Sequence, residues 1–188
     1  MRDDKGVLVS ATSSVGGKLS KKERDWIVLL RKLKGQYNVN FDQHIHAVLS
    51  EAGFVDDQID ERFFSTQYVR QPHENGVHNV SVGFSRFGHL GATTKKVMDE
   101  ISKMNRYCGT LHVGLAIARE HPVIEMDIQI LLLGTTMQFS DKKSSGWAPL
   151  IELGPNTRRL TMVYRAPVNK SSMWSGNIQH LGFQIMDS

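Results

Sequence analysis

The chain has 188 residues, of which 40% are hydrophobic and 22% charged, so it is expected to fold around one sizeable core, and an intrinsically disordered chain is excluded. Its net charge of +4 and pI of about 9.2 favour an anionic partner, without selecting among nucleic acid, an acidic protein and a membrane surface. The longest apolar run, residues 128–133, is too short to span a bilayer, so any membrane contact is expected to be peripheral.

The start of the chain combines a polar segment with a clear helix signal. Residues 1–17 are polar and rich in serine and glycine, which predicts a flexible tail. A helix is expected to begin after Ser20, because Ser20 and Glu23 match the S-x-x-E capping box. Gly35 is a natural end for this helix, since glycine readily adopts the backbone conformation that follows a helix.

Two further helices are expected before the pattern changes. One covers residues 41–52, and a shorter one covers residues 56–64. Together with the first helix they would form a helical N-terminal arm over residues 18–70. The turn-rich segment at residues 71–76 connects this arm to the remainder of the chain.

From residue 77 the apolar residues alternate as they do in strands, with one helix between them that ends near Met104. Strands are expected at residues 77–84, 111–117, 124–132, 150–153, 160–166 and 178–186. This order predicts an α+β fold, in which N-terminal helices precede a bent, mostly antiparallel sheet with one inserted helix. The strand-rich body, residues 77–188, is expected to form one compact domain with the arm.

The strongest functional signal is the basic amphipathic helix within residues 18–35. Its apolar residues follow helical spacing, so Trp26 is expected either to insert at an interface or to anchor the helix to the body. The segment has seven basic residues and only two acids, Glu23 and Asp25, and this excess of positive charge favours contact with an anionic surface. An ordinary surface helix is an equally weighted alternative. The candidates for contact with an anionic surface are Lys18, Lys21, Lys22, Arg24, Arg31, Lys32 and Lys34.

A second candidate site is the segment 140–146 (SDKKSSG), which has the composition of an exposed loop. It contains Lys142 and Lys143, and Phe139 and Trp147 flank it. Polar residues held between two aromatic residues suit insertion into a neighbouring subunit, although plain exposure to solvent is the alternative.

The cysteine and the histidines predict no metal centre. The chain lacks H-E-x-x-H and C-x-x-C, and its single cysteine, Cys108, is expected to be a small buried thiol. His44 and His46 are two residues apart, so they are not expected to share a face of a helix. We expect neither a metal nor a cofactor.

A catalytic site would have to be assembled from distant residues. His112, Glu125 and Asp127 are candidates for such a site, with His112 on a strand. The alternative for all three is the wetter face of a sheet. No motif joins these residues, so catalysis is the least favoured hypothesis.

The body of the chain has a distinctive order of elements. The strand HNVSVGF precedes the loop and helix SRFGHLGATTKKVMDEISKM, the paired strands TLHVGLAIA and IEMDIQILLLG, the polar loop SDKKSSGW, and the closing strands RRLTMVYRA and NIQHLGFQI. In this order, roughly residues 77–186 resemble the rhabdovirus matrix proteins. The resemblance implies a non-enzymatic virion protein with an α+β matrix fold that self-associates, condenses the nucleocapsid and binds the inner membrane face. It also implies that residues 140–147 occupy the place of the family's self-association loop.

Two features depart from that family. Animal members often carry PPxY or P[ST]AP in a disordered N-terminal tail, and this chain has neither motif. Its basic stretch also has the pattern of a folded helix. These departures put that budding route in doubt and favour a plant- or arthropod-infecting member.

Three hypotheses follow. The leading one is a viral matrix protein that bridges nucleocapsid and membrane, with itself, the nucleocapsid, an anionic membrane surface and RNA as partners. It would reside in the virion and in the host cytoplasm and membranes, with the nucleus as a further location. The second is an RNA-binding movement or coat protein built on a β-sandwich, and the third is a small enzyme with an unrecognised site.

Overall fold

A ten-stranded mixed sheet dominates the part of the chain that the computed structural model describes, which comprises residues 8–9, 20–87, 91–139, 146–164, 173–174 and 178–186. Its strands are β1 (Leu8–Val9), β2 (Gln36–Asn40), β3 (Thr66–Val69), β4 (Val77–Arg86), β6 (Tyr107–Cys108), β7 (Ile128–Leu131), β8 (Thr136–Phe139), β9 (Trp147–Leu153), β10 (Arg158–Tyr164) and β12 (Gln179–Ile185). The short strands β5 (Ala92–Thr93) and β11 (Met173–Trp174) form a separate pair.

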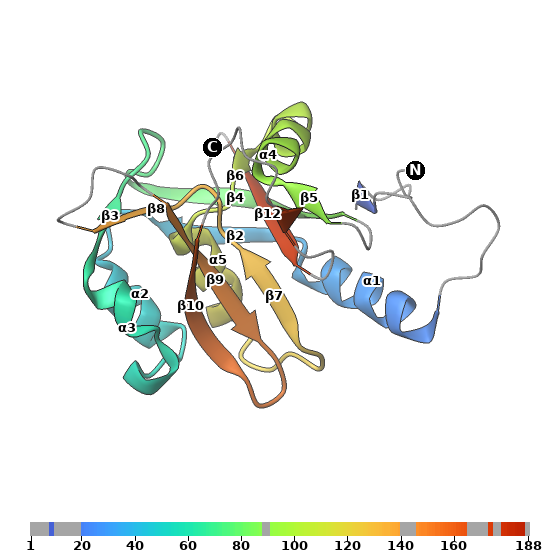
Figure 1. Ribbon diagram of the computed structural model, residues 1–188, viewed down its shortest axis with the longest axis horizontal. Helices are drawn as coiled ribbons and strands as arrows, with labels where there is room; N and C mark the ends of the chain where they lie inside the picture. The colour runs from blue at the N-terminus through green and yellow to red at the C-terminus, as the bar shows by residue number, and fades with distance from the viewer. Residues whose placement is uncertain are drawn as a thin grey trace.

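The sheet is mostly antiparallel and bent. Its main order is β1-β4-β12-β7-β9-β8-β3, with β2 beside β4, β6 beside β12 and β10 beside β9. Only the β1–β4 and β12–β7 pairs are parallel among the described strands. Figure 1 shows β2 and β4 along the long axis of the molecule, while β7, β9 and β10 run across it.

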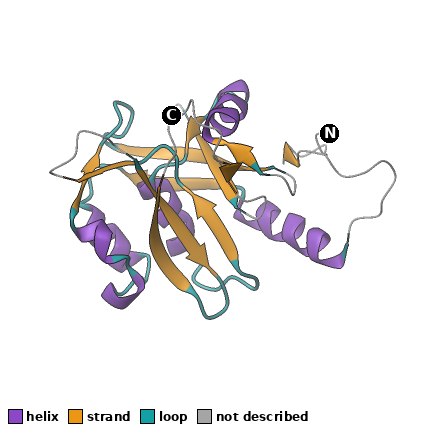
Figure 2. Ribbon diagram, in the orientation of Figure 1, coloured by secondary structure: helices purple, strands orange, loops and turns teal. Residues whose placement is uncertain are grey.

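The helices lie at the edges of this sheet and against one of its faces (Figure 2). They are α1 (Lys21–Leu33), α2 (Ile45–Glu51), the 3-10 helix η1 (Asp56–Gln58), α3 (Glu61–Phe64), α4 (Thr94–Lys103) and α5 (Leu111–Glu120). Figure 1 places α1 at one end of the long axis and α2 with α3 at the other. The combination of helices with a mixed sheet confirms the α+β prediction.

The predicted strand at residues 111–117 is wrong, because this segment is the helix α5. Two helices, α4 and α5, therefore interrupt the described strands of the body, rather than one. Every residue from 111 to 118 is buried, so α5 has no polar side to reveal its helical period. The large residues at alternate positions produced a false strand pattern.

The N-terminal arm, residues 18–70, contains strands as well as helices. Strand β2 pairs with β4 and strand β3 pairs with β8, so both belong to the large sheet. Tyr37 and Val39 of β2 are buried and alternate with exposed residues, which is the pattern of a strand with one face on a core. The arm is therefore tied to the body by backbone pairing.

A tight backbone contact joins two turns of the sheet at Gly134. The N–H of Gly134 donates to the carbonyl oxygen of Gly109 at 2.9 Å. A Cβ at Gly134 would overlap the carbonyl of Cys108, since it would lie 2.9 Å from the carbonyl carbon and closer still to the oxygen. Only glycine lets the two turns approach in this way.

Gly134→Ala is therefore expected to lower the free energy of unfolding by roughly 2 kcal/mol, because backbone atoms must move to admit the methyl group. Urea denaturation followed by circular dichroism measures this change. Gly35→Ala is the matched control, since its nearest contact, the Tyr37 ring, would be 3.8 Å away. Equal stability of the two variants would contradict the assignment.

Candidate functional site

Helix α1 begins at the predicted cap. The Ser20 hydroxyl oxygen accepts a hydrogen bond from the backbone N–H of Glu23, at 3.2 Å. The Glu23 carboxylate in turn accepts from the backbone N–H of Ser20 at 2.8 Å. This reciprocal capping box confirms the predicted start of the helix and uses the Glu23 carboxylate within the helix.

The apolar side of α1 holds the helix on the body. Trp26, Leu29, Leu30 and Leu33 are all buried and belong to the main hydrophobic core cluster. Trp26, with 9% of its surface exposed, is thus an anchor to the body rather than an exposed interfacial residue. Because burial of such side chains contributes roughly 1.5–3 kcal/mol each, the orientation of α1 is well determined.

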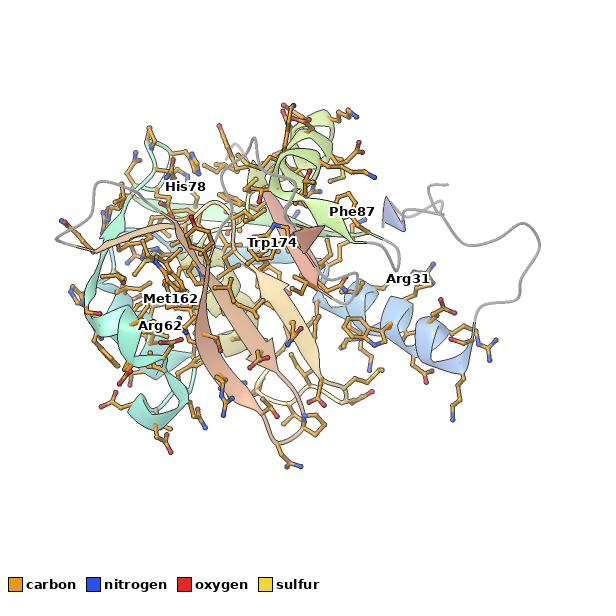
Figure 3. The ribbon with its side chains drawn as sticks, viewed as in Figure 1. Arg31, Arg62, His78, Phe87, Met162 and Trp174 are labelled. Atoms are coloured by element: carbon orange, nitrogen blue, oxygen red, sulfur yellow. The ribbon has the colours of Figure 1, made fainter. Side chains whose placement is uncertain are left out.

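The opposite side of α1 is basic. Lys21, Arg24, Arg31 and Lys32 are exposed, and Figure 3 shows Arg31 on this helix. All four lie three, four or seven positions from Val28, which places them around it on one face of the helix. Val28 is itself 51% exposed, so an apolar side chain lies at the centre of the cations. We call Lys21, Arg24, Val28, Arg31 and Lys32 the basic face.

Among the other basic candidates, Lys34 lies off this face, six positions from Val28. Lys34 is the C-cap residue of α1 and is half-buried. Lys18 lies outside the described residues, and only the backbone of Lys22 is described.

Two acidic residues lie at the basic face, because exposed Asp25 is three positions before Val28 on α1 and Glu125 pairs with Lys32. Lys32 Nζ lies 3.0 Å from Glu125 Oε1, but more than half of each side chain is exposed. An ion pair this exposed contributes about 0–1 kcal/mol and can be exchanged for another anion. The basic face can therefore bind carboxylates or phosphates by charge, with the apolar Val28 available for contact at its centre.

The second candidate site, the loop over residues 140–146, is described only at its ends. Lys142 and Lys143 lie outside the described residues. Phe139 is the last residue of β8, and only its backbone is described. The self-association role of this loop stays a prediction.

Trp147, which follows the loop, packs on the body. Its ring meets the Tyr164 ring edge to face at 5.8 Å, and the Arg62 guanidinium lies 4.8 Å from its centre. Arg62 is held by Asp60, whose carboxylate also accepts from the backbone N–H of Met162 at 3.1 Å. Figure 3 labels Arg62 and Met162 in this region. Trp147 is therefore half-buried and engaged by its own chain.

The three residues of the hypothetical catalytic site are not brought together. His112 is buried near the start of α5, which corrects its expected place on the wetter face of a strand. Glu125 pairs with Lys32 at the surface, and Asp127 is also exposed. Neither carboxylate is among the hydrogen-bond or ion-pair partners of His112 in the described residues.

His112 instead belongs to a buried polar cluster. The Tyr68 hydroxyl donates to the Glu74 carboxylate, and the backbone N–H of Gln71 donates to the same carboxylate at 2.8 Å. His112 Nδ1 lies 3.4 Å from the Tyr68 oxygen, and Nε2 lies 3.1 Å from the carbonyl oxygen of Gln43. Burial, and next the Glu74 charge, raise the pKa of Tyr68.

This cluster has the marks of a structural network. The side chains of His112 and Glu74 are 1% and 0% exposed, so a reacting molecule has no access to them. Burial lowers the pKa of His112, which keeps the ring neutral and able to donate from Nε2 to the Gln43 carbonyl. The burial of Glu74 was not predicted from the sequence, because Glu74 lies in a turn-rich connector, where acidic residues are normally exposed.

His44 and His46 differ from expectation, because their rings stack with centres 5.3 Å apart. His44 is the N-cap of α2 rather than a residue within the helix, so the helical spacing rule does not separate the two rings. Cys108 is half-buried in β6 rather than fully buried. In the part of the chain that the structure describes, no group of three or more His, Cys, Asp or Glu residues is arranged to hold a metal ion.

Among the described residues, no helix has the length and apolar character needed to cross a bilayer. Comparisons of the chain with models of protein families, with curated proteins and with solved structures gave no significant match. The candidate site therefore depends on the geometry of α1 itself.

Proposed function

We propose that this chain is a viral matrix protein of the rhabdovirus type, a non-enzymatic structural protein that self-assembles and bridges the nucleocapsid to the inner face of an anionic membrane. Such a protein would be found in the virion, in the host cytoplasm and at host membranes. The observation that carries the proposal is the basic face of α1, which lies opposite the side that anchors the helix to the core.

The physics of α1 supports a peripheral contact with an anionic surface. Each Lys or Arg near an anionic membrane contributes about 1 kcal/mol, and this contribution falls off within a Debye length. The exposed Val28 would add a small apolar contact at the centre of the cations. Each basic face would bind weakly by itself, and its binding would weaken further with added salt.

The test is reversal of charge on the basic face. The variant Lys21→Glu, Arg24→Glu, Arg31→Glu is expected to bind vesicles of phosphatidylserine and phosphatidylcholine at least about a hundredfold more weakly, because roughly 3 kcal/mol of attraction is lost. Co-sedimentation across a salt series measures this binding. Vesicles of phosphatidylcholine alone give the charge-independent background.

The matched control reverses three cations of α4, by Lys95→Glu, Lys96→Glu and Lys103→Glu. It changes the net charge by the same amount on a different helix and is expected to retain most vesicle binding. Equal loss in both variants would indicate a response to net charge alone and would contradict the assignment to α1. Tight binding of single-stranded RNA without vesicle binding would instead favour the movement- or coat-protein hypothesis.

A further inference from the structure

The end of the molecule opposite α1 carries a surface of the opposite charge. Figure 1 shows α2 and α3 at the far end of the long axis from α1, and η1 lies between them in the chain. Asp56, Asp57 and Glu61 are exposed there, and none of them forms an ion pair with another described residue. Asp60, by contrast, is paired with Arg62.

This acidic surface also has apolar components. Val55 and Phe64 are 55% and 50% exposed. The ring of Phe64 stacks on that of His46 with centres 5.8 Å apart, which keeps it in a defined position at the surface. Glu61 precedes Phe64 by three positions on α3, so the two share a face. We call Val55, Asp56, Asp57, Glu61 and Phe64 the acidic end.

We propose that the basic face of α1 docks head to tail on the acidic end of a second copy of this chain. The proposal rests on the self-assembly part of the proposed function and names the surfaces that make the contact. Both surfaces have exposed charges around exposed apolar side chains, Val28 on one and Phe64 with Val55 on the other. Their charges are opposite, so the encounter is favoured and the register is restricted.

The position of the two surfaces determines the kind of assembly. They lie at opposite ends of the long axis, so they cannot meet within one chain (Figure 1). A symmetric dimer through either surface would bring like charges together. A head-to-tail contact leaves one basic face and one acidic end available at the ends of every assembly, so growth is open-ended unless the rotation between copies closes a ring.

An anionic membrane would engage the same cations. The head-to-tail contact therefore covers the basic face until the protein reaches a surface with a higher density of negative charge. Both interactions are expected to weaken with added salt, since exposed charges are screened.

The test reverses charge on the acidic end. Asp57→Lys with Glu61→Lys is expected to raise the protein concentration needed for assembly at least about tenfold, because two attractive pairs become repulsive. Sedimentation velocity and light scattering over a concentration series measure the assembly state. The matched control, Asp99→Lys with Glu100→Lys on α4, makes the same change of charge elsewhere and is expected to assemble as the native protein does.

Mixing gives a sharper result. The α1 variant Lys21→Glu, Arg24→Glu, Arg31→Glu should also fail to assemble alone, but an equimolar mixture with the acidic-end variant should assemble, since each reversed surface meets an opposite charge. Native-like assembly by the acidic-end variant would overturn the inference, as would a mixture that stays monomeric. A native protein that stays monomeric would overturn it too.

The test separates this inference from the proposed function. The acidic-end variant keeps the basic face intact, so it is expected to bind phosphatidylserine-containing vesicles at least as well as the native protein. Failure of the mixing experiment together with α1-dependent vesicle binding would remove the head-to-tail contact alone. Loss of α1-dependent vesicle binding in the native protein would remove the proposed function.

Discussion

Lowering the pH from 7 to 5 is expected to reduce the free energy of unfolding by at least roughly 2 kcal/mol, because two histidines are buried in neutral form. His180 of β12 is 1% exposed, its ring meets that of Phe87 at 5.4 Å, and its Nδ1 has no hydrogen-bond partner among the described residues. Burial lowers the pKa of His180 to about 3. Burial also lowers the pKa of His112, although the bond to Gln43 and the charge of Glu74 oppose the shift.

The direction of the effect follows from proton binding in the two states. Histidine in an unfolded chain has a pKa of about 6.5, so below this pH the unfolded state binds protons that the folded state excludes. The stability is therefore fully present above about pH 6.5 and is lost as the pH falls toward the folded pKa. At pH 5 a histidine such as His180 accounts for a loss of roughly 2 kcal/mol.

Asp60 does not contribute to this change. The hydrogen bond from Arg62 is the largest cause that lowers the pKa of Asp60 to about 2. The stability from Asp60 is present above its ordinary pKa of about 3.9 and is lost only as the pH falls toward 2. The window between pH 7 and 5 therefore reports on the histidines.

Urea denaturation at pH 7, 6 and 5 measures the pH dependence. His180→Gln removes one titrating group, so its stability is expected to fall by roughly 2 kcal/mol less than that of the native protein over this range. The comparison uses the change with pH within each variant, so the cost of placing Gln in the core cancels. Parallel pH profiles for the two proteins would show that His180 does not govern the change.

Local signals in the sequence predicted part of this fold correctly. The capping box at Ser20 defined the start of α1, since capping depends on residues within one turn. The alternation from residue 77 identified β4, and the expected helix ending near Met104 is α4. In α1, α4 and the N-terminal half of β4, one side is more buried than the other, and this difference produces a periodic pattern.

The missed elements lack that difference or depend on distant partners. Helix α5 is buried on all sides, and Gly114 allows close approach to the sheet, since a Cβ there would lie 2.9 Å from the side chain of Leu132. Its pattern therefore reflects packing against the sheet rather than contact with solvent. Strand β3 has no strong alternation of its own and is a strand because it pairs with β8.

The candidate site likewise has features that depend on local sequence and features that depend on distant residues. The basic face of α1 could be predicted, because charge and helical spacing are both local properties of the sequence. The acidic end could not, since exposed Phe64 and the stacked His46 are brought together by the packing of α3 against α2. The burial of Glu74 and Trp147 likewise depends on residues distant in sequence, Glu74 on His112 and Trp147 on Arg62.

Loss of the Arg158 side chain is expected to destabilise the fold strongly, because this residue joins the ends of two helices to β10. Its guanidinium donates to four backbone carbonyls, those of Ala52, Ala118, His121 and Pro122. The first belongs to the C-terminal cap of α2, and the next two belong to the end of α5. Helix C-termini have unpaired carbonyls and partial negative charge, so one planar cation satisfies the ends of two helices at once.

Arg158→Met preserves much of the side-chain volume but removes every donor. Ala52 and Ala118 are almost fully buried, so their carbonyls would lose a charged partner with little access to water. A buried group left in this way costs about 1–3 kcal/mol, so the free energy of unfolding is expected to fall by roughly 3–5 kcal/mol. For a chain of this size that corresponds to a decrease in Tm of roughly 10 °C.

Thermal denaturation of two matched variants tests this expectation. Arg159 is the next residue on β10 and is exposed, so Arg159→Met removes the same charge from the same strand and is expected to change stability by less than about 0.5 kcal/mol. Arg158→Lys should fall between the two, because a single ammonium group cannot reach four carbonyls arranged around a planar guanidinium. If Arg158→Met were as stable as Arg159→Met, then the ends of α2 and α5 would have to be satisfied by water or by other donors. The role of Arg158 in joining the two helices to β10 would then be wrong.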